Sequence, residues 1–222
     1  MLRRCNPWPS IVDLFAALLL LAFGGMMLLS GLVPHPGGGQ GTATPIDARA
    51  NEIMREAHQE LVEAGVPATL RACGRDRCIE VSVHFETDKD VIYQPNERAG
   101  LRAVCGALKR ALDALKSDER SAMQLLIEGH TDSRPPRIRI PEKEYFLYNW
   151  GLSARRAGAV LWEFQGSGLT SPPYNITAVG KAATDNLCSE QTEDCWAKNR
   201  RITLRLQVDT HKLERSERGM GK

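Results

Sequence analysis

The sequence lacks the motifs on which most enzyme classes depend. It has no recognisable Ser/His/Asp grouping, no metal-binding spacing and no glycine-rich phosphate loop, so we expect no enzymatic activity. Basic residues (29) barely outnumber acidic ones (27), and the net charge is only +2. Without a large basic surplus to neutralise phosphates, nucleic acid is not an expected partner. We also find no internal repeat.

What the chain does have is an ordinary globular composition and one long apolar run. The run covers residues 11–33 and is interrupted only by Asp13 and Ser30. At about 1.5 Å per residue it is long enough for the roughly 30 Å core of a bilayer. We therefore predict a transmembrane helix over 11–33 after a short N-terminus, 1–10. A cleaved signal peptide is disfavoured, because the run is long, contains an acid, and precedes neither an A-x-A site nor a lipobox cysteine.

The distribution of basic residues predicts the orientation of this span. Arg3 and Arg4 precede it, and the next arginine or lysine is Arg49. The positive-inside rule then places the N-terminus in the cytoplasm and everything after the span outside.

Asp13 has two interpretations. Acids within a membrane span are costly, so they are by default functional candidates, here for carrying an ion. However, Asp13 lies only about a turn inside the span, in a Ser10-x-x-Asp13 pattern typical of a helix start, where an acid meets the helix dipole favourably. From position alone, helix capping and ion carriage both remain open.

A linker and a short helix follow the span, together covering residues 34–66. Residues 34–45 are rich in Pro, Gly and Thr, which is typical of a linker. The stretch 47–64 is predicted to be helical because Ile53, Ala57 and Leu61 recur on one face. This helix lies either against the membrane or a partner, or on the domain that follows.

Beyond residue 66, strand-like and helix-like segments alternate, which predicts crossover connections over a mixed sheet. We predict an α/β fold, an α+β sandwich with helices on a mixed sheet, over 67–209, and a disordered tail over 210–222. The expected strands are 69–73, 78–85, 123–128, 176–179 and 202–208, and the expected helices are 97–115 and 152–164.

Four of the cysteines are closely spaced in two pairs, Cys73 with Cys78 and Cys188 with Cys195. Such pairs outside the membrane favour two disulfides in an oxidising compartment. A four-cysteine zinc site is the alternative, but the C-x2-C spacing is missing. The two other cysteines are expected to be a buried thiol and a reduced cytoplasmic thiol, at Cys105 and Cys5.

Four short motifs occur in an order that is recognisable. They are IEGHTD (127–132), NWGLSARRA (149–157), ITAVG (176–180) and NRRIT (199–203). Each is weak alone, but together they resemble the OmpA C-terminal domain over about residues 79–208. The resemblance implies the α+β sandwich of that domain type.

The same resemblance implies binding to peptidoglycan, chiefly to the diaminopimelate of its stem peptide. Asp132 would bind the ligand's ammonium group, and Arg156 would bind its carboxylate bidentately. The other expected wall-binding residues are Thr131, Tyr148, Asn149, Leu152, Asn199 and Arg200. Each also has a structural interpretation: an ion pair between Asp132 and Arg156, a helix cap at Asn149, plain core at Leu152, and strand entry at Asn199 and Arg200.

One segment departs from the family pattern. Residues 133–148 are longer than in common relatives and carry Arg134, Arg137 and Arg139. This insertion is expected to shape the cleft or to meet anionic glycan or partner surfaces. Because of this insertion, the resemblance implies wall binding in general more strongly than it implies a preference for diaminopimelate.

The pairing of one acid-bearing span with a wall-binding domain resembles MotB-type stator subunits, whose span aspartate carries the ion. Under that resemblance Asp13 is the ion-carrying residue, and the chain is a single-pass protein of the bacterial inner membrane with a periplasmic C-terminal domain. No cofactor is expected beyond the translocated H+ or Na+. A flagellar-type stator or a passive envelope anchor are the alternatives.

Within that group the chain looks most like the ZorB subunits of Zorya anti-phage defence systems. The compact size, the cysteines and the stretch 148–156 carry this resemblance. It implies a homodimer whose two spans are surrounded by five copies of a MotA-like ZorA partner.

Overall fold

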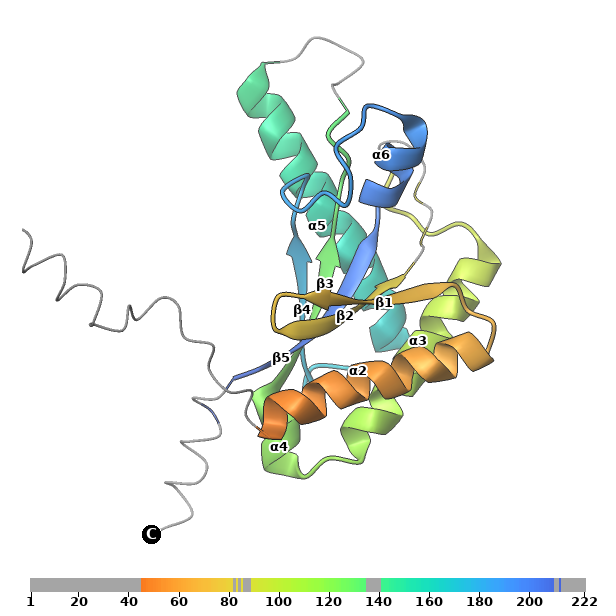
Figure 1. The fold of residues 1–222 in the computed structure, drawn as a ribbon, viewed down its shortest axis with the longest axis vertical. Coiled ribbons are helices and arrows are strands. Elements are labelled where there is room, and N and C mark those ends of the chain that lie inside the picture. The colour runs from red at the N-terminus through yellow and green to blue at the C-terminus, as the bar shows by residue number, and fades with distance from the viewer. Residues whose placement is uncertain are drawn as a thin grey trace, which may run out of the picture. The chain divides into compact units, whose positions relative to one another are not determined.

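The computed structural model describes residues 45–81, 83, 85, 89–134, 141–209 and 212 (Figure 1). The predicted span with Asp13, the Pro/Gly-rich linker before Pro45, Cys5 and nearly all of the predicted tail lie outside these residues. None of the helices in the described ranges is both long and apolar enough to cross a bilayer.

A five-stranded mixed sheet, in the order β1-β2-β5-β3-β4, organises the domain. The pair β3–β4 is parallel, whereas β1–β2, β2–β5 and β3–β5 are antiparallel. The predicted mixed sheet is therefore confirmed. The strands are β1 (Ala68–Cys73), β2 (Asp76–Val81), β3 (Met123–Gly129), β4 (Asn175–Gly180) and β5 (Ile202–Val208).

Helices cover one face of the sheet. Alternate strand residues such as Ile79, Ile127 and Leu204 are fully buried and join one core with the helices. The N-terminal helix α2 packs on β1, β2 and β5, and α5 packs on β3 and β4. The helices are α2 (Pro45–Glu63), α3 (Pro95–Asp113), α4 (Ser117–Ala122), α5 (Glu142–Gly166) and α6 (Glu193–Asn199).

The position of α2 decides between the two interpretations of the segment after the linker. Its Ile53, Met54, Ala57 and Leu61 are at most 1% exposed within the domain core. The apolar face that the periodicity predicted is therefore buried against the domain itself. This helix belongs to the same compact unit as the sheet, Ala43–Lys222.

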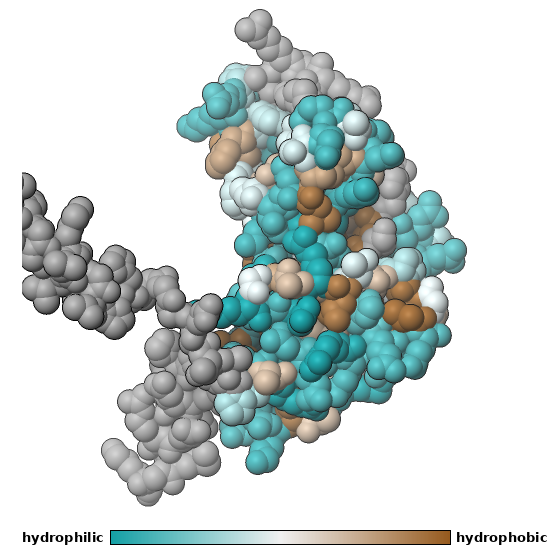
Figure 2. All heavy atoms as spheres, in the orientation of Figure 1, coloured by the Kyte–Doolittle hydropathy of each residue, from teal (hydrophilic) through white to brown (hydrophobic). Residues whose placement is uncertain are grey.

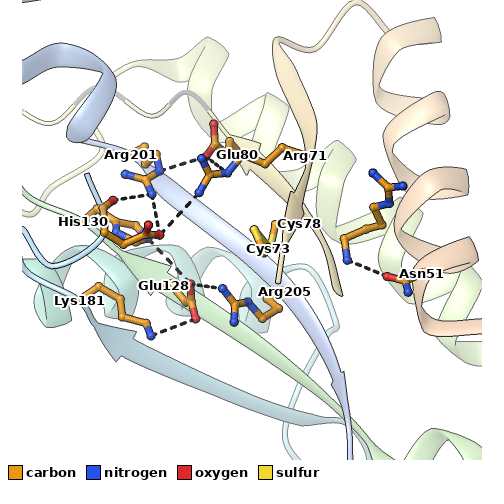
Figure 3. The surroundings of a disulfide bond; sticks show 12 residues. Asn51, Arg71, Cys73, Cys78, Glu80, Glu128, His130, Lys181, Arg201 and Arg205 are labelled. Carbon is orange, nitrogen blue, oxygen red and sulfur yellow. Dashed lines mark hydrogen bonds and ion pairs between the residues drawn. A yellow bond between two sulfur atoms is a disulfide. The ribbon is translucent and has the colours of Figure 1, made fainter. Parts of the chain in front are cut away.

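The opposite face of the sheet is polar (Figure 3). On it, Glu128 of β3 lies 3.6 Å from both Lys181 and Arg205. Glu80 of β2 pairs with Arg201 at 3.1 Å. Because the side chains of Glu128 and Glu80 are only 2% and 14% exposed, their carboxylates need these cations as neighbours.

Two elements, α5 and β2, differ most from the sequence prediction at their ends. The helix expected over 152–164 begins ten residues earlier, at Glu142. Pro141 precedes it, Glu142 and Glu144 favour the positive end of the helix dipole, and no proline interrupts the turns that follow. The N-terminal end of α5 consequently extends beyond the strands (Figure 1). Strand β2 ends at Val81 rather than at residue 85.

The short helices α4 and α6 were not predicted. They have six and seven residues, too few to show a helical apolar period.

The end of β3 approaches α5 unusually closely. A Cβ atom added at Gly129 would overlap the backbone carbonyl of Ser153, and one at Gly180 would lie 2.8 Å from the Ser153 hydroxyl oxygen. Glycine at both positions therefore sets how near α5 lies to the β3–β4 edge.

We predict that Gly129→Ala destabilises the separately expressed unit 43–222 by about 1–3 kcal/mol, because its new methyl group meets backbone that cannot turn away. Gly158→Ala in α5 is the control, since nothing lies within 4 Å of its added Cβ. Urea unfolding measures both. Equal midpoints for the two variants would contradict this account of the packing.

Candidate functional site

Asp132, just beyond the end of β3, lies at the centre of a cluster of charges. Its carboxylate accepts a hydrogen bond from Arg200 Nη1 at 2.6 Å and one from Arg134 Nη2 at 3.3 Å. It also accepts the backbone N–H of Arg134 at 3.0 Å, which closes an Asx turn. The Asp132 side chain is 15% exposed, so it is reachable from solvent although already paired.

Helix α6 supports both arginines from the other side. Glu193 Oε1 accepts hydrogen bonds from Arg200 at 2.7 Å and from Arg134 at 3.2 Å. The Arg134 guanidinium also lies over the Trp196 ring, 4.6 Å from its centre. Two acids and two arginines thus form one neutral cluster, which we call the Asp132 cluster: Asp132, Arg134, Glu193 and Arg200.

Electrostatics in this cluster favour the charged forms. Burial works against the charge of Arg200, but its hydrogen bonds to Asp132 and Glu193 outweigh that cost and raise its pKa. The hydrogen bond from Arg200 in turn lowers the pKa of Glu193. Both pKa shifts favour the charged forms of Arg200 and Glu193.

A disulfide and an amide hold α6 in place. Cys188 and Cys195 are joined, as are Cys73 and Cys78, so both predicted pairs are confirmed. The carboxamide oxygen of Asn199 accepts the N–H of Leu187 at 2.7 Å, and its nitrogen donates to the Cys188 carbonyl at 3.0 Å. Asn199 is fully buried, so its side chain serves the loop before α6.

The side chain of Arg156 contacts a different part of the domain from the two arginines that pair with Asp132. Its Nε donates to the Lys89 carbonyl at 3.0 Å, and its guanidinium lies over the Phe85 ring at 5.0 Å. The residue is 3% exposed. An ion pair between Arg156 and Asp132 was the structural interpretation of the two residues, and the structure shows Arg134 and Arg200 paired with Asp132 instead.

The residues just before Asp132 are buried. Thr131 donates its N–H to the Ala182 carbonyl at 2.9 Å, while its hydroxyl has no hydrogen-bond partner within the described residues. His130 is 1% exposed, and burial lowers its pKa to about 3. A neutral, buried His130 agrees with a structural role for it.

The first turns of α5 project from the domain and are exposed. Phe146 and Leu147 are 57% and 56% exposed, and Tyr148 is 39% exposed. Figure 2 shows apolar surface at this projecting end. Asn149 lies inside the helix rather than at its cap, and Leu152 is buried.

Sequence reasoning missed several members of the site. Arg134 was noted only as part of the insertion, and Glu193 and Trp196 were not singled out. Ser153, within the second motif, was also missed: its hydroxyl accepts the Ala182 N–H at 3.0 Å and donates to the Trp150 carbonyl. Sequence spacing offers no signal for Glu193. It is linked to Asp132 through the two arginines that both acids contact, and Glu193 lies far from Asp132 in the chain.

The dependence of the Asp132 cluster on α6 can be tested by hydrogen exchange. We predict that replacing Cys188 and Cys195 by alanine speeds exchange of the amides in 193–201 and 129–134 by about tenfold or more, because the loop loses its cross-link. Replacing Cys73 and Cys78 by alanine is the control, since that disulfide joins the distant β1–β2 turn. Equal effects of the two removals on these amides would contradict the coupling.

Several solved structures have the same fold. A MotB-like protein from Desulfovibrio vulgaris is 22% identical, with a TM-score of 0.52, and the match covers 73% of this chain and 93% of that one. The cell wall anchor of the type VI secretion system from Pseudomonas aeruginosa is 18% identical, with a TM-score of 0.50 and coverage of 72% and 99%. The periplasmic domain of Helicobacter pylori MotB (residues 97–256) is 15% identical, with a TM-score of 0.51 and coverage of 69% and 97%.

At these identities the likeness is one of fold. No curated protein matches the chain. The model of the OmpA family, in contrast, matches residues 78–200, more than half of the chain, and spans β3, the Asp132 cluster and α5. The chain therefore belongs to the OmpA family.

Proposed function

We propose that this protein binds peptidoglycan through the Asp132 cluster and anchors a membrane complex to the cell wall. The single observation that carries the proposal is Asp132 itself, a partly exposed carboxylate at the end of β3 within the OmpA-family match. Support also comes from the fold's likeness to a structure described as a cell wall anchor and to a MotB periplasmic domain.

The chemistry of the site suits a diamino acid of the stem peptide. The Asp132 carboxylate would accept hydrogen bonds from the ligand's ammonium group, and arginine would bind its carboxylate. Arg156 remains the residue that the family pattern assigns to that carboxylate. Thr131, Tyr148, Asn149, Leu152, Asn199 and Arg200 are proposed to shape or line the same site.

We predict that Asp132→Asn and Arg156→Gln each lower co-sedimentation of the full chain with isolated peptidoglycan by at least about tenfold. Each change removes one charge-assisted contact, worth about 1.5–3 kcal/mol. Arg49→Gln is the control, because Arg49 lies on α2 and, among the described residues, pairs with its helix neighbours Glu52 and Glu56. Undiminished binding by both variants would refute the assignment of the site.

We further propose that the chain is the B subunit of a proton- or sodium-driven rotary motor with a MotA-like partner. In this proposal Asp13, in the apolar run 11–33, carries the ion. Neutralising its carboxylate removes the penalty of a charge in a dry surround, so partner contacts differ between the loaded and empty states. Each crossing charge supplies about 2.3 kcal/mol per 100 mV, and the wall-bound domain provides the fixed point for that work.

Asp13→Asn tests the motor. The variant keeps nearly the same shape but cannot lose a proton, so we predict that rotation or the cellular activity that depends on it is abolished, with expression and wall binding unchanged. Single-particle or tethered rotation assays with the co-expressed partner give the readout. Full activity of Asp13→Asn would leave only a passive anchor, in which Asp13 caps a helix.

We propose, at the finest level, that the chain is the ZorB component of a Zorya anti-phage defence system. It would form a homodimer surrounded by five copies of a MotA-like ZorA subunit. The stretch 148–156 and the paired cysteines support it over a flagellar-type stator. A passive envelope anchor is the second candidate, favoured by the fold's likeness to the type VI secretion wall anchor. Co-purification of a MotA-like membrane protein separates the motor from the anchor.

A further inference from the structure

The loop before α6 and the first turn of that helix bring three metal-binding side chains together. The sulfurs of Cys188 and Cys195 and a carboxylate oxygen of Glu190 all lie within 4.8 Å of one another. Thiolate sulfur and carboxylate oxygen are both zinc ligands, with bonds of about 2.0–2.3 Å to the ion. In the oxidised chain the two sulfurs are bonded to each other. The set can therefore hold a metal ion only when both cysteines are reduced, because the thiolate is the form that binds metal.

The carboxylate of Glu190 is not engaged elsewhere in the described domain. Glu190 is exposed, and none of the described residues forms a hydrogen bond or an ion pair with it. Glu193, three positions later, differs in this respect because it pairs with both Arg200 and Arg134. Of these two acids, Glu190 is the one whose carboxylate is available as a ligand beside the sulfurs.

The buried Asn199 side chain holds the two cysteines near each other independently of the bond between them. Its oxygen accepts the N–H groups of Leu187 and Cys188 at 2.7 and 3.4 Å. Its nitrogen donates to the Cys188 carbonyl at 3.0 Å and to Cys195 Sγ at 3.7 Å. A donor directed at sulfur also stabilises the thiolate, as hydrogen bonds around metal ligands commonly do. The loop and α6 thus stay linked through Asn199 when the sulfurs are not bonded to each other.

We propose that the dithiol form of this protein binds one Zn²⁺ ion through Cys188, Cys195 and Glu190, with water as the fourth ligand. Binding forms two zinc–sulfur bonds and releases the two thiol protons to solvent. The dithiol form exists before the disulfide is made. A dithiol reductant regenerates it by exchange, and the reductant's own two thiols become a disulfide. Zinc binding and oxidation are then alternative ways to close the same loop.

The choice of zinc follows from the ligand types. Two thiolates suit a borderline-soft ion such as Zn²⁺, whereas Ca²⁺ and Mg²⁺ prefer sites made of oxygen ligands alone. The other cysteine pair offers no comparable site, since no third ligand accompanies Cys73 and Cys78 among the residues that the structure describes. The consequence for the fold is that Zn²⁺ would fix α6 in the reduced chain, as the disulfide does in the oxidised chain.

Metal binding is measured on the full chain in detergent, reduced with a phosphine and titrated with Zn²⁺ in competition with a chromophoric chelator. We expect one Zn²⁺ per chain beyond the amount that Cys188→Ala/Cys195→Ala binds, and no such binding by the oxidised chain. Cys73→Ala/Cys78→Ala is the matched control and should retain the ion. Co²⁺ used in place of Zn²⁺ should show the thiolate-to-metal charge-transfer absorption of a sulfur-bound ion.

A single substitution tests the third ligand without removing either cysteine. Glu190→Gln should weaken Zn²⁺ binding by about tenfold or more, since losing even a hydrogen-bond partner of a metal ligand costs about 10–100-fold. Asp194→Asn is the control, because it removes an exposed acid beside Cys195 that is not one of the three ligands. Equal weakening by the two substitutions would contradict direct ligation by Glu190.

Hydrogen exchange reports whether the ion closes the loop. In the reduced chain, Zn²⁺ should slow exchange of the amides in 193–201 by about tenfold, toward the rates of the oxidised chain. A reduced chain that binds no more Zn²⁺ than Cys188→Ala/Cys195→Ala, or whose 193–201 amides exchange equally fast with and without Zn²⁺, would refute the inference. Neither measurement involves peptidoglycan, so its result is independent of the proposed wall binding.

Discussion

The close contact between β3 and α5 is the constraint on which the rest of the site depends. Gly129 at the end of β3 and Gly180 at the end of β4 let the backbone at Ser153 come within reach of both strands. The Ser153 hydroxyl then accepts the N–H of Ala182, in the loop that follows β4. Because β3 and β4 are parallel, their carboxyl ends meet at one edge of the sheet, and Asp132 emerges there beside α5.

Helix α6 closes the site from the side opposite α5. It is too short to be stable alone, so the Cys188–Cys195 disulfide and the buried Asn199 amide determine its place. Through Glu193 it fixes the two arginines that flank Asp132. The Asp132 carboxylate is thereby paired with two guanidinium groups while its side chain stays 15% exposed.

Hydrophobic periodicity was sufficient to predict the sheet, the core helices and the docked face of α2, because those elements bury one side. It also predicted the strand 123–128, which the structure shows as Met123–Gly129, shortly before Asp132. It did not reveal α6, whose seven residues contain no apolar period, or the early start of α5. Periodicity did not reveal the partners of Asp132 either, since Arg200 lies 68 positions away and contacts that distant follow from topology. Only the family resemblance assigned Arg200 to the same site.

The most direct test of wall binding at Asp132 is a structure of the full chain bound to a muropeptide that ends in meso-diaminopimelate. We predict the ligand's ammonium group within hydrogen-bonding distance of Asp132 and its adjacent carboxylate against arginine. Ligand bound at a surface remote from β3 and α6, or a site that stays empty at saturating muropeptide, would contradict the assignment of this protein as a wall-binding anchor.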